Sequence, residues 1–181
     1  MALPETDTID CADLHEITKA EFEANFVQAD TVIPNPAFKK TGLNIKVPDT
    51  DIVFEDDTTE AGYQEYFAEG SLSHFYVVEQ LDYQSTEYYL ISREAKETYD
   101  LVGRPKLYGN TILSIEGEHV DSPVTVELWQ LANKKLAPNK IFAIGNCDIF
   151  NIIDTYLNKN YLYIKHMALT DKYVYVKLKI S

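Results

Sequence analysis

Two groups of acidic side chains offer the oxygen ligands that a divalent cation prefers. The first runs from Asp49 to Glu60 but lacks EF-hand spacing, since Phe54 stands where that loop requires glycine. The second places His119 and Asp121 two residues apart, a spacing that puts both on one face of a strand. The same residues are typical of a solvated hairpin loop. We therefore assign no metal ligands and keep a metal-dependent hydrolase with a carboxylate–His site as an alternative.

Signatures of covalent or cofactor chemistry are missing from the sequence. The chain has no G-x-S-x-G nucleophile motif and no glycine-rich phosphate loop. We assign no catalytic residue and no cofactor, and we expect a binding protein rather than an enzyme.

Tyrosine is the more informative residue, with 13 tyrosines against 8 phenylalanines. Near the C-terminus, Tyr161, Tyr163, Tyr173 and Tyr175 alternate with apolar residues in two strand-like segments. Tyrosine suits a half-wet surface and is enriched in binding interfaces. We interpret this face as a candidate binding surface for a protein or a glycan. The alternative is that the N-terminal arm or helix covers it.

The chain has two cysteines, Cys11 and Cys147, which is too few for a disulfide framework. In an exported protein they would form one bridge that pins the N-terminal arm to the core. The alternative is two buried free thiols.

The net charge is −13, and most of it belongs to the first 70 residues, which carry 16 acidic and 4 basic side chains. This charge repels phosphate backbones and excludes nucleic acid as an expected partner. No apolar run reaches the roughly 18 residues of a membrane helix, and no signal peptide is visible. We expect a protein that does not span a membrane, and we favour export to the periplasm or cell surface over the cytoplasm.

One short helix is expected at residues 19–28. Thr18 and Glu21 have the spacing of a capping box, and Ile17 and Phe22 occupy the positions of a hydrophobic staple. Phe22 and Phe26 are four residues apart and share a helix face. Pro34 and Pro36 prevent the helix from continuing.

From residue 41 the apolar period changes to two, which indicates strands separated by polar turns. We predict an all-β fold, mainly an antiparallel meander that curls into a sandwich or half-barrel. About ten strands are recognisable. The smallest propeller needs four blades of four strands each, so the chain has too few strands to form one. Residues 55–70 read as a polar loop. The chain is expected to be a single domain, 1–181, with an N-terminal arm over 1–40 and a β-rich core over 41–181.

The register of the last hairpin follows from its two apolar sets. Leu162 and Ile164 on the first strand, and Val174, Val176 and Leu178 on the second, are all even-numbered. Directly opposed residues share a face, so each opposed pair must sum to an even number. A three-residue loop would place Ile164 opposite Val176 and Lys165 opposite Tyr175.

Residues 74–131 combine a Tyr-Leu-Ile strand at 89–91, a Gly-Arg-Pro corner at 103–105 and a later strand with Leu128–Trp129. This combination resembles uncharacterised exported β-domains of bacteria with blade-like meanders. The resemblance implies an exported β-rich module and supplies no active site. Our interpretation is a non-enzymatic binding module, with a structural domain of an envelope protein as a further alternative.

Overall fold

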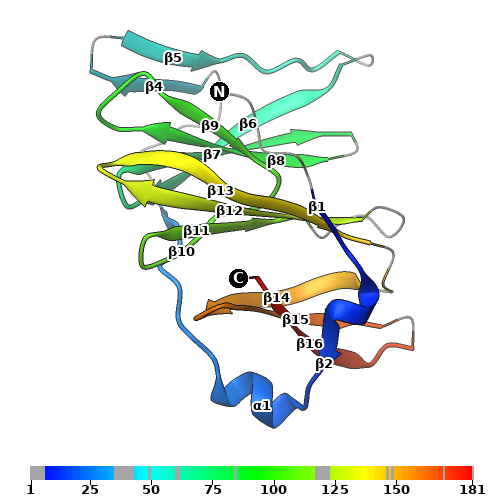
Figure 1. Cartoon of the computed structure of the whole chain (residues 1–181). Helices are drawn as coiled ribbons and strands as arrows, with labels where there is room; N and C mark the ends of the chain where they lie inside the picture. Colours follow the sequence, from blue (N-terminus) through cyan, green and yellow to red (C-terminus); the bar gives the residue numbers. More distant parts are fainter. Residues whose placement is uncertain are drawn as a thin grey trace.

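The structure is a computed structural model that describes residues 7–34, 43–48, 50–59, 62–83, 85–116, 123–145, 147, 149–168 and 170–180. In this part of the chain, four β-sheets stack face to face in an open row (Figure 1). The all-β class, the antiparallel meander and the single short α-helix predicted from the sequence are confirmed. Sandwich-type packing of one sheet on another is repeated along the row.

The first two layers come from the first half of the chain. The outermost layer has β4 (Leu43–Val47) and β5 (Thr50–Phe54). The next is a five-stranded sheet in the order β3-β6-β7-β8-β9. Its strands are β3 (Ile33–Pro34), β6 (Gln64–Leu72), β7 (Phe75–Asp82), β8 (Thr86–Ser92) and β9 (Thr98–Leu101).

The third layer has the order β1-β13-β12-β11-β10, in which only β1 runs parallel to its neighbour. Its strands are β1 (Asp7–Ile9), β10 (Lys106–Tyr108), β11 (Thr111–Ile115), β12 (Val124–Ala132) and β13 (Lys135–Ile144).

The fourth layer has the order β14-β15-β16-β2. The strands of this layer are β2 (Leu14–Glu16), β14 (Phe150–Asn158), β15 (Tyr161–Met167) and β16 (Tyr173–Lys179). Helix α1 (Lys19–Ala24) lies beyond the fourth layer, at the end of the row (Figure 1).

Three apolar clusters join the four layers. Leu43 and Ile45 of β4 pack with Val78 of the second layer. The second and third layers meet through a cluster that includes Phe75 and Trp129. The cluster between the third and fourth layers is the largest, with Leu113, Val126, Leu128, Phe142, Ile144, Leu162, Ile164, Val176 and Leu178 among its members. The two middle sheets are therefore buried on both faces, which is why their strands are apolar at successive positions.

The hairpin register predicted from sequence is confirmed. Ile164 pairs with Val176 and Lys165 pairs with Tyr175. Ile164 is completely buried, whereas Tyr173 on the opposite set is 56% exposed. The parity of the apolar positions thus identified the face that points to the core.

Residues 55–70 differ from the prediction, because Gln64–Leu72 forms β6 instead of a polar loop. Its composition is poor for a strand, with Ala68, Gly70 and two glutamates. Pairing with β7 overrides this weak local preference. Gly70 is required there, since a Cβ at this position would lie 2.0 Å from the carbonyl oxygen of Ile33 on β3.

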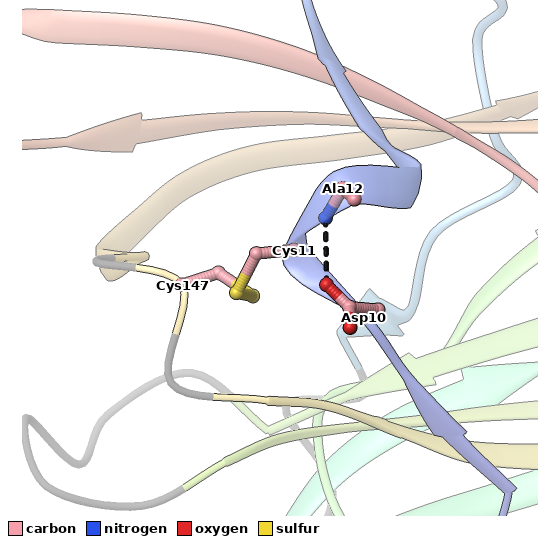
Figure 2. The surroundings of a disulfide bond; sticks show 4 residues. All are labelled: Asp10, Cys11, Ala12 and Cys147. Carbon is pink, nitrogen blue, oxygen red and sulfur yellow. Dashed lines mark hydrogen bonds between the residues drawn. A yellow bond between two sulfur atoms is a disulfide. The ribbon is translucent and has the colours of Figure 1, made fainter.

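The N-terminal segment is part of the sheets. β1 extends the third layer, β2 extends the fourth, and the short 3-10 helix η1 (Cys11–Asp13) lies between them. Cys11 on η1 forms a disulfide with Cys147, which follows β13, and their Cα atoms are 5.3 Å apart. Figure 2 shows the bridge beside the Asp10 side chain, which accepts a hydrogen bond from the Ala12 N–H at 2.9 Å. The disulfide therefore ties the N-terminal segment to the connection between the third and fourth layers.

The helix begins as predicted but ends earlier, at Ala24 instead of Gln28. Thr18 caps it by accepting the Glu21 N–H at 3.1 Å. At the other end, the Asn25 side-chain amide donates to the carbonyl of Glu21 at 2.8 Å, which satisfies a terminal acceptor. The Glu21 carboxylate pairs with Lys177 of β16 at 2.6 Å. This ion pair fastens the helix to the sheet and raises the pKa of Lys177.

Candidate functional site

The four candidate tyrosines lie on the outer face of the fourth sheet, opposite the core. In the ladder, Tyr161 pairs with Lys179, Tyr163 with Lys177, and Met167 with Tyr173. Because opposed residues share a face, the tyrosines and these lysines form one mixed aromatic and basic surface. Helix α1 lies against this surface (Figure 1).

Phe22 of α1 covers the centre of the tyrosine face. Its ring centroid lies 4.8 Å from that of Tyr156, 5.2 Å from that of Tyr175 and 6.4 Å from that of Tyr163. Tyr163 is only 5% exposed and stacks on Tyr156 with centroids 4.6 Å apart. Tyr163 is therefore part of the helix–sheet packing and is not open to a partner. The candidate binding surface is therefore smaller than the four tyrosines suggested.

Tyr156 is a central residue that sequence reasoning did not identify. It belongs to β14, and its hydroxyl donates to the backbone carbonyl of Phe22. Burial raises its pKa, with a further contribution from the neighbouring Tyr163. β14 was not identified from the sequence as a strand, because its apolar and polar residues do not alternate and two register shifts interrupt its pairing with β15. Its content of β-branched and aromatic residues was the available signal.

A groove of about 420 Å³ remains open between α1 and the sheet. We call it the α1 groove. Aromatic rings form its apolar part, and two lysines and two carboxylates surround them. Its lining residues are Lys19, Phe22, Glu23, Phe26, Asp154, Lys165, Tyr173 and Tyr175.

Two of these aromatic rings are accessible. Phe26 is 50% exposed and Tyr173 is 56% exposed, whereas Phe22 beneath them is buried. Large aromatic side chains that stay exposed beside a groove are the features that most often anchor a bound partner. Phe26 and Tyr173 are thus the strongest candidates for contact with a ligand.

The charged groups around the α1 groove are held in place by partners. Lys19 pairs with Glu23 at 3.4 Å, and Asp154 pairs with Lys106 at 3.1 Å. The Lys165 ammonium lies 4.3 Å from the centroid of the Tyr173 ring, a cation–π geometry. The groove therefore offers both hydrogen-bond donors and acceptors.

The polar groups that line the α1 groove are the ammonium groups of two lysines, two carboxylates and the hydroxyls of two tyrosines. None of its lining residues is serine, threonine, cysteine or histidine, so the groove contains no hydroxyl, thiol or imidazole apart from its two phenols. His166 lies on the β15–β16 hairpin beside the groove. It is even-numbered, so its side chain lies on the same face as the apolar core residues Leu162 and Ile164. It is 4% exposed with no partner at Nδ1, and burial lowers its pKa.

The residues proposed for a carboxylate–His site, His119 and Asp121, lie outside the described residues, as do Asp49 and Glu60. Within the described ranges, no group of three or more His, Cys, Asp or Glu side chains is arranged to hold a metal ion. The helices of the described part of the chain are too short and too polar to cross a membrane.

Comparisons of the chain with protein-family models, with curated proteins and with solved structures find no match.

Proposed function

We propose that this protein is a non-enzymatic binding module, exported from the cell, that recognises a glycan or a protein through the α1 groove. The observation that carries the proposal is the pair of exposed rings, Phe26 and Tyr173, beside a groove that lysines and carboxylates also line. Sites for small ligands combine an apolar wall with a few placed polar groups. The α1 groove has this combination.

Of the two partner classes, a glycan suits the α1 groove better. A sugar ring has an apolar C–H face that packs on an aromatic ring and a rim of hydroxyls that both donate and accept hydrogen bonds. Tyr173 and Phe26 supply the rings, while Lys19 and Glu23 supply a donor and an acceptor. A volume of about 420 Å³ lies within the usual range for ligand sites and accommodates one or two sugar units.

Export is supported by the disulfide between Cys11 and Cys147. Such bonds persist in oxidising compartments and are rare in the reducing cytosol. The resemblance of residues 74–131 to exported bacterial β-domains points in the same direction.

A glycan array probed with the labelled protein, followed by calorimetry on the best ligand, tests the proposal. We expect Tyr173→Ala and Phe26→Ala each to weaken binding by about tenfold, the loss typical of one aromatic anchor. Val53→Ala is the matched control, since Val53 is 55% exposed on β5 at the opposite end of the row. Unchanged affinity in both groove variants would overturn the assignment of the site. If no glycan binds and a photoreactive residue at position 173 captures a protein, the partner of the α1 groove is a protein and not a glycan.

A further inference from the structure

The strand β9 forms an edge of the second sheet, because in the described part of the chain it pairs with β8 alone. Its alternation shows which backbone groups face outward. The carbonyl of Glu97, just before β9, accepts the Ser92 N–H at 2.9 Å and so points toward the β8 side. In an antiparallel pair the direction alternates at each residue, so Thr98 and Asp100 direct their N–H and C=O groups to the open side.

The next outward N–H along this edge belongs to Val102, and a side chain takes the place of a strand there. Glu127 of β12, which is 6% exposed, accepts the Val102 N–H at 3.1 Å and the indole N–H of Trp129 at 3.3 Å. The edge is thus closed at Val102 and open over Thr98–Asp100.

A groove of about 630 Å³ runs beside this open edge. We call it the β9 groove. It contains three aromatic residues, Tyr89, Tyr99 and Trp129, and its other wall includes Pro138, which has no N–H to offer a strand. Its charged lining residues are all acidic, Glu87, Asp100 and Glu127, and none of its lining residues is lysine, arginine or histidine.

The side chains beside this edge are divided between the two faces of the second sheet. Asp100 is directly opposite Tyr89, so these two residues and Glu87, two positions before Tyr89, share one face of the sheet. Tyr99 lies on the other face, where it contacts Trp129 with ring centroids 6.1 Å apart. A strand added to β9 would alternate its side chains between a face with Glu87, Asp100 and Tyr89 and a face with Tyr99 and Trp129.

We propose that the β9 edge is a docking site for an extended peptide segment in which basic and apolar residues alternate. The peptide backbone pairs with Thr98 and Asp100, as in other cases of β-strand addition. Its lysine or arginine side chains face Glu87 and Asp100, and its apolar side chains face Tyr99. This site is at the second layer and does not depend on the α1 groove.

The first test uses a peptide of about seven residues with alternating lysine and valine, with blocked ends, and measures its affinity by fluorescence anisotropy. The control is the same peptide N-methylated at alternate residues, which keeps the charge but removes the N–H groups needed for strand pairing. We expect binding of the plain peptide and at least about tenfold weaker binding of the methylated one. Equal affinities would show attraction by charge alone and would overturn the proposal, as would no binding of the plain peptide.

The second test changes the edge of the protein. Thr98→Pro removes an N–H that points away from β8, a position where an edge strand tolerates proline, and Thr98→Val is its matched control. We expect Thr98→Pro to weaken the binding of the unmethylated peptide at least about tenfold and Thr98→Val to leave this affinity unchanged. Both variants should have the same melting temperature. Equal affinity of the two variants would overturn strand addition. Displacement of the peptide by low concentrations of spermidine would instead identify the β9 groove as a site for small amines.

Discussion

Tyr156 contacts Phe22 with both its hydroxyl and its ring. The hydroxyl donates a hydrogen bond to the Phe22 carbonyl, and the centroids of the two rings are 4.8 Å apart. These two residues are 134 positions apart in the sequence. Their contact fixes α1 on the fourth sheet and determines which tyrosines are covered. The position of the α1 groove depends on it.

Phe22→Ala should therefore release the helix. We expect the free energy of unfolding to fall by about 3 kcal/mol, the usual cost of removing a buried phenylalanine ring. Urea denaturation measures this loss, and the near-ultraviolet circular dichroism of the tyrosines should weaken because Tyr163 becomes mobile. Phe26→Ala is the comparison. Because Phe26 is half exposed, this substitution should lower the free energy of unfolding by about 1 kcal/mol or less. Equal losses in the two variants would contradict the central place of Phe22.

Thr18→Ala should remove the cap at the start of α1. The lost hydrogen bond to the Glu21 N–H is expected to cost about 1 kcal/mol. Hydrogen exchange should quicken at residues 19–25 and stay unchanged in β15 and β16. Thr18→Ser keeps the hydroxyl and should behave like the native chain. Slower exchange in the helix of Thr18→Ala than in Thr18→Ser would refute the capping role.

Reduction of the Cys11–Cys147 bond should lower stability strongly, because the bond closes a loop with a sequence separation of 136. The chain-entropy model assigns about 4–5 kcal/mol to a loop of this size. The double substitution to serine, compared with the oxidised protein by urea denaturation, measures the loss. Thiol labelling of the purified, unreduced protein provides the first check, and labelling of both cysteines would contradict a disulfide in the native protein.

Glu127→Gln should change how stability depends on pH. Burial raises the pKa of Glu127 above its ordinary value of 4.5, so the folded protein keeps this proton after the unfolded chain has lost it. Native stability should therefore fall as pH rises from about 4.5 through the raised pKa and then level off. Glutamine does not ionise, so the stability of the variant relative to the native chain should increase over that interval.

Urea denaturation at a series of pH values measures this difference. A difference that shrinks with rising pH would contradict the effect of burial. Glu127→Ala is a second variant, which leaves the N–H groups of Val102 and Trp129 without their acceptor. It should cost about 2–3 kcal/mol below pH 4.5, because two buried donors lose their partner. This cost should shrink over the same pH interval, because alanine does not ionise either.

The sequence alone determined the features that depend on neighbours along the chain. The parity of Leu162, Ile164, Val176 and Leu178 identified the core face of the last hairpin, because a strand alternates its faces with a period of two. Together with a three-residue loop, it predicted the register that the structure has. The Thr18 cap was predictable for a similar reason, since its partner is only three residues away. The all-β class followed from the same local pattern repeated along the chain.

Which faces are covered depends on how distant segments of the chain pack together. Nothing local indicated that Gln64–Leu72 would pair with β7, that β1 and β2 would join sheets built from the C-terminal half, or that Phe22 would bury Tyr163. These outcomes depend on contacts between distant segments, whose energies come from packing and pairing and not from local preference. The exposure of Tyr173 and Phe26, and the open edge at Thr98–Asp100, exist for the same reason: each is what the stacking of the four sheets and the helix leaves uncovered.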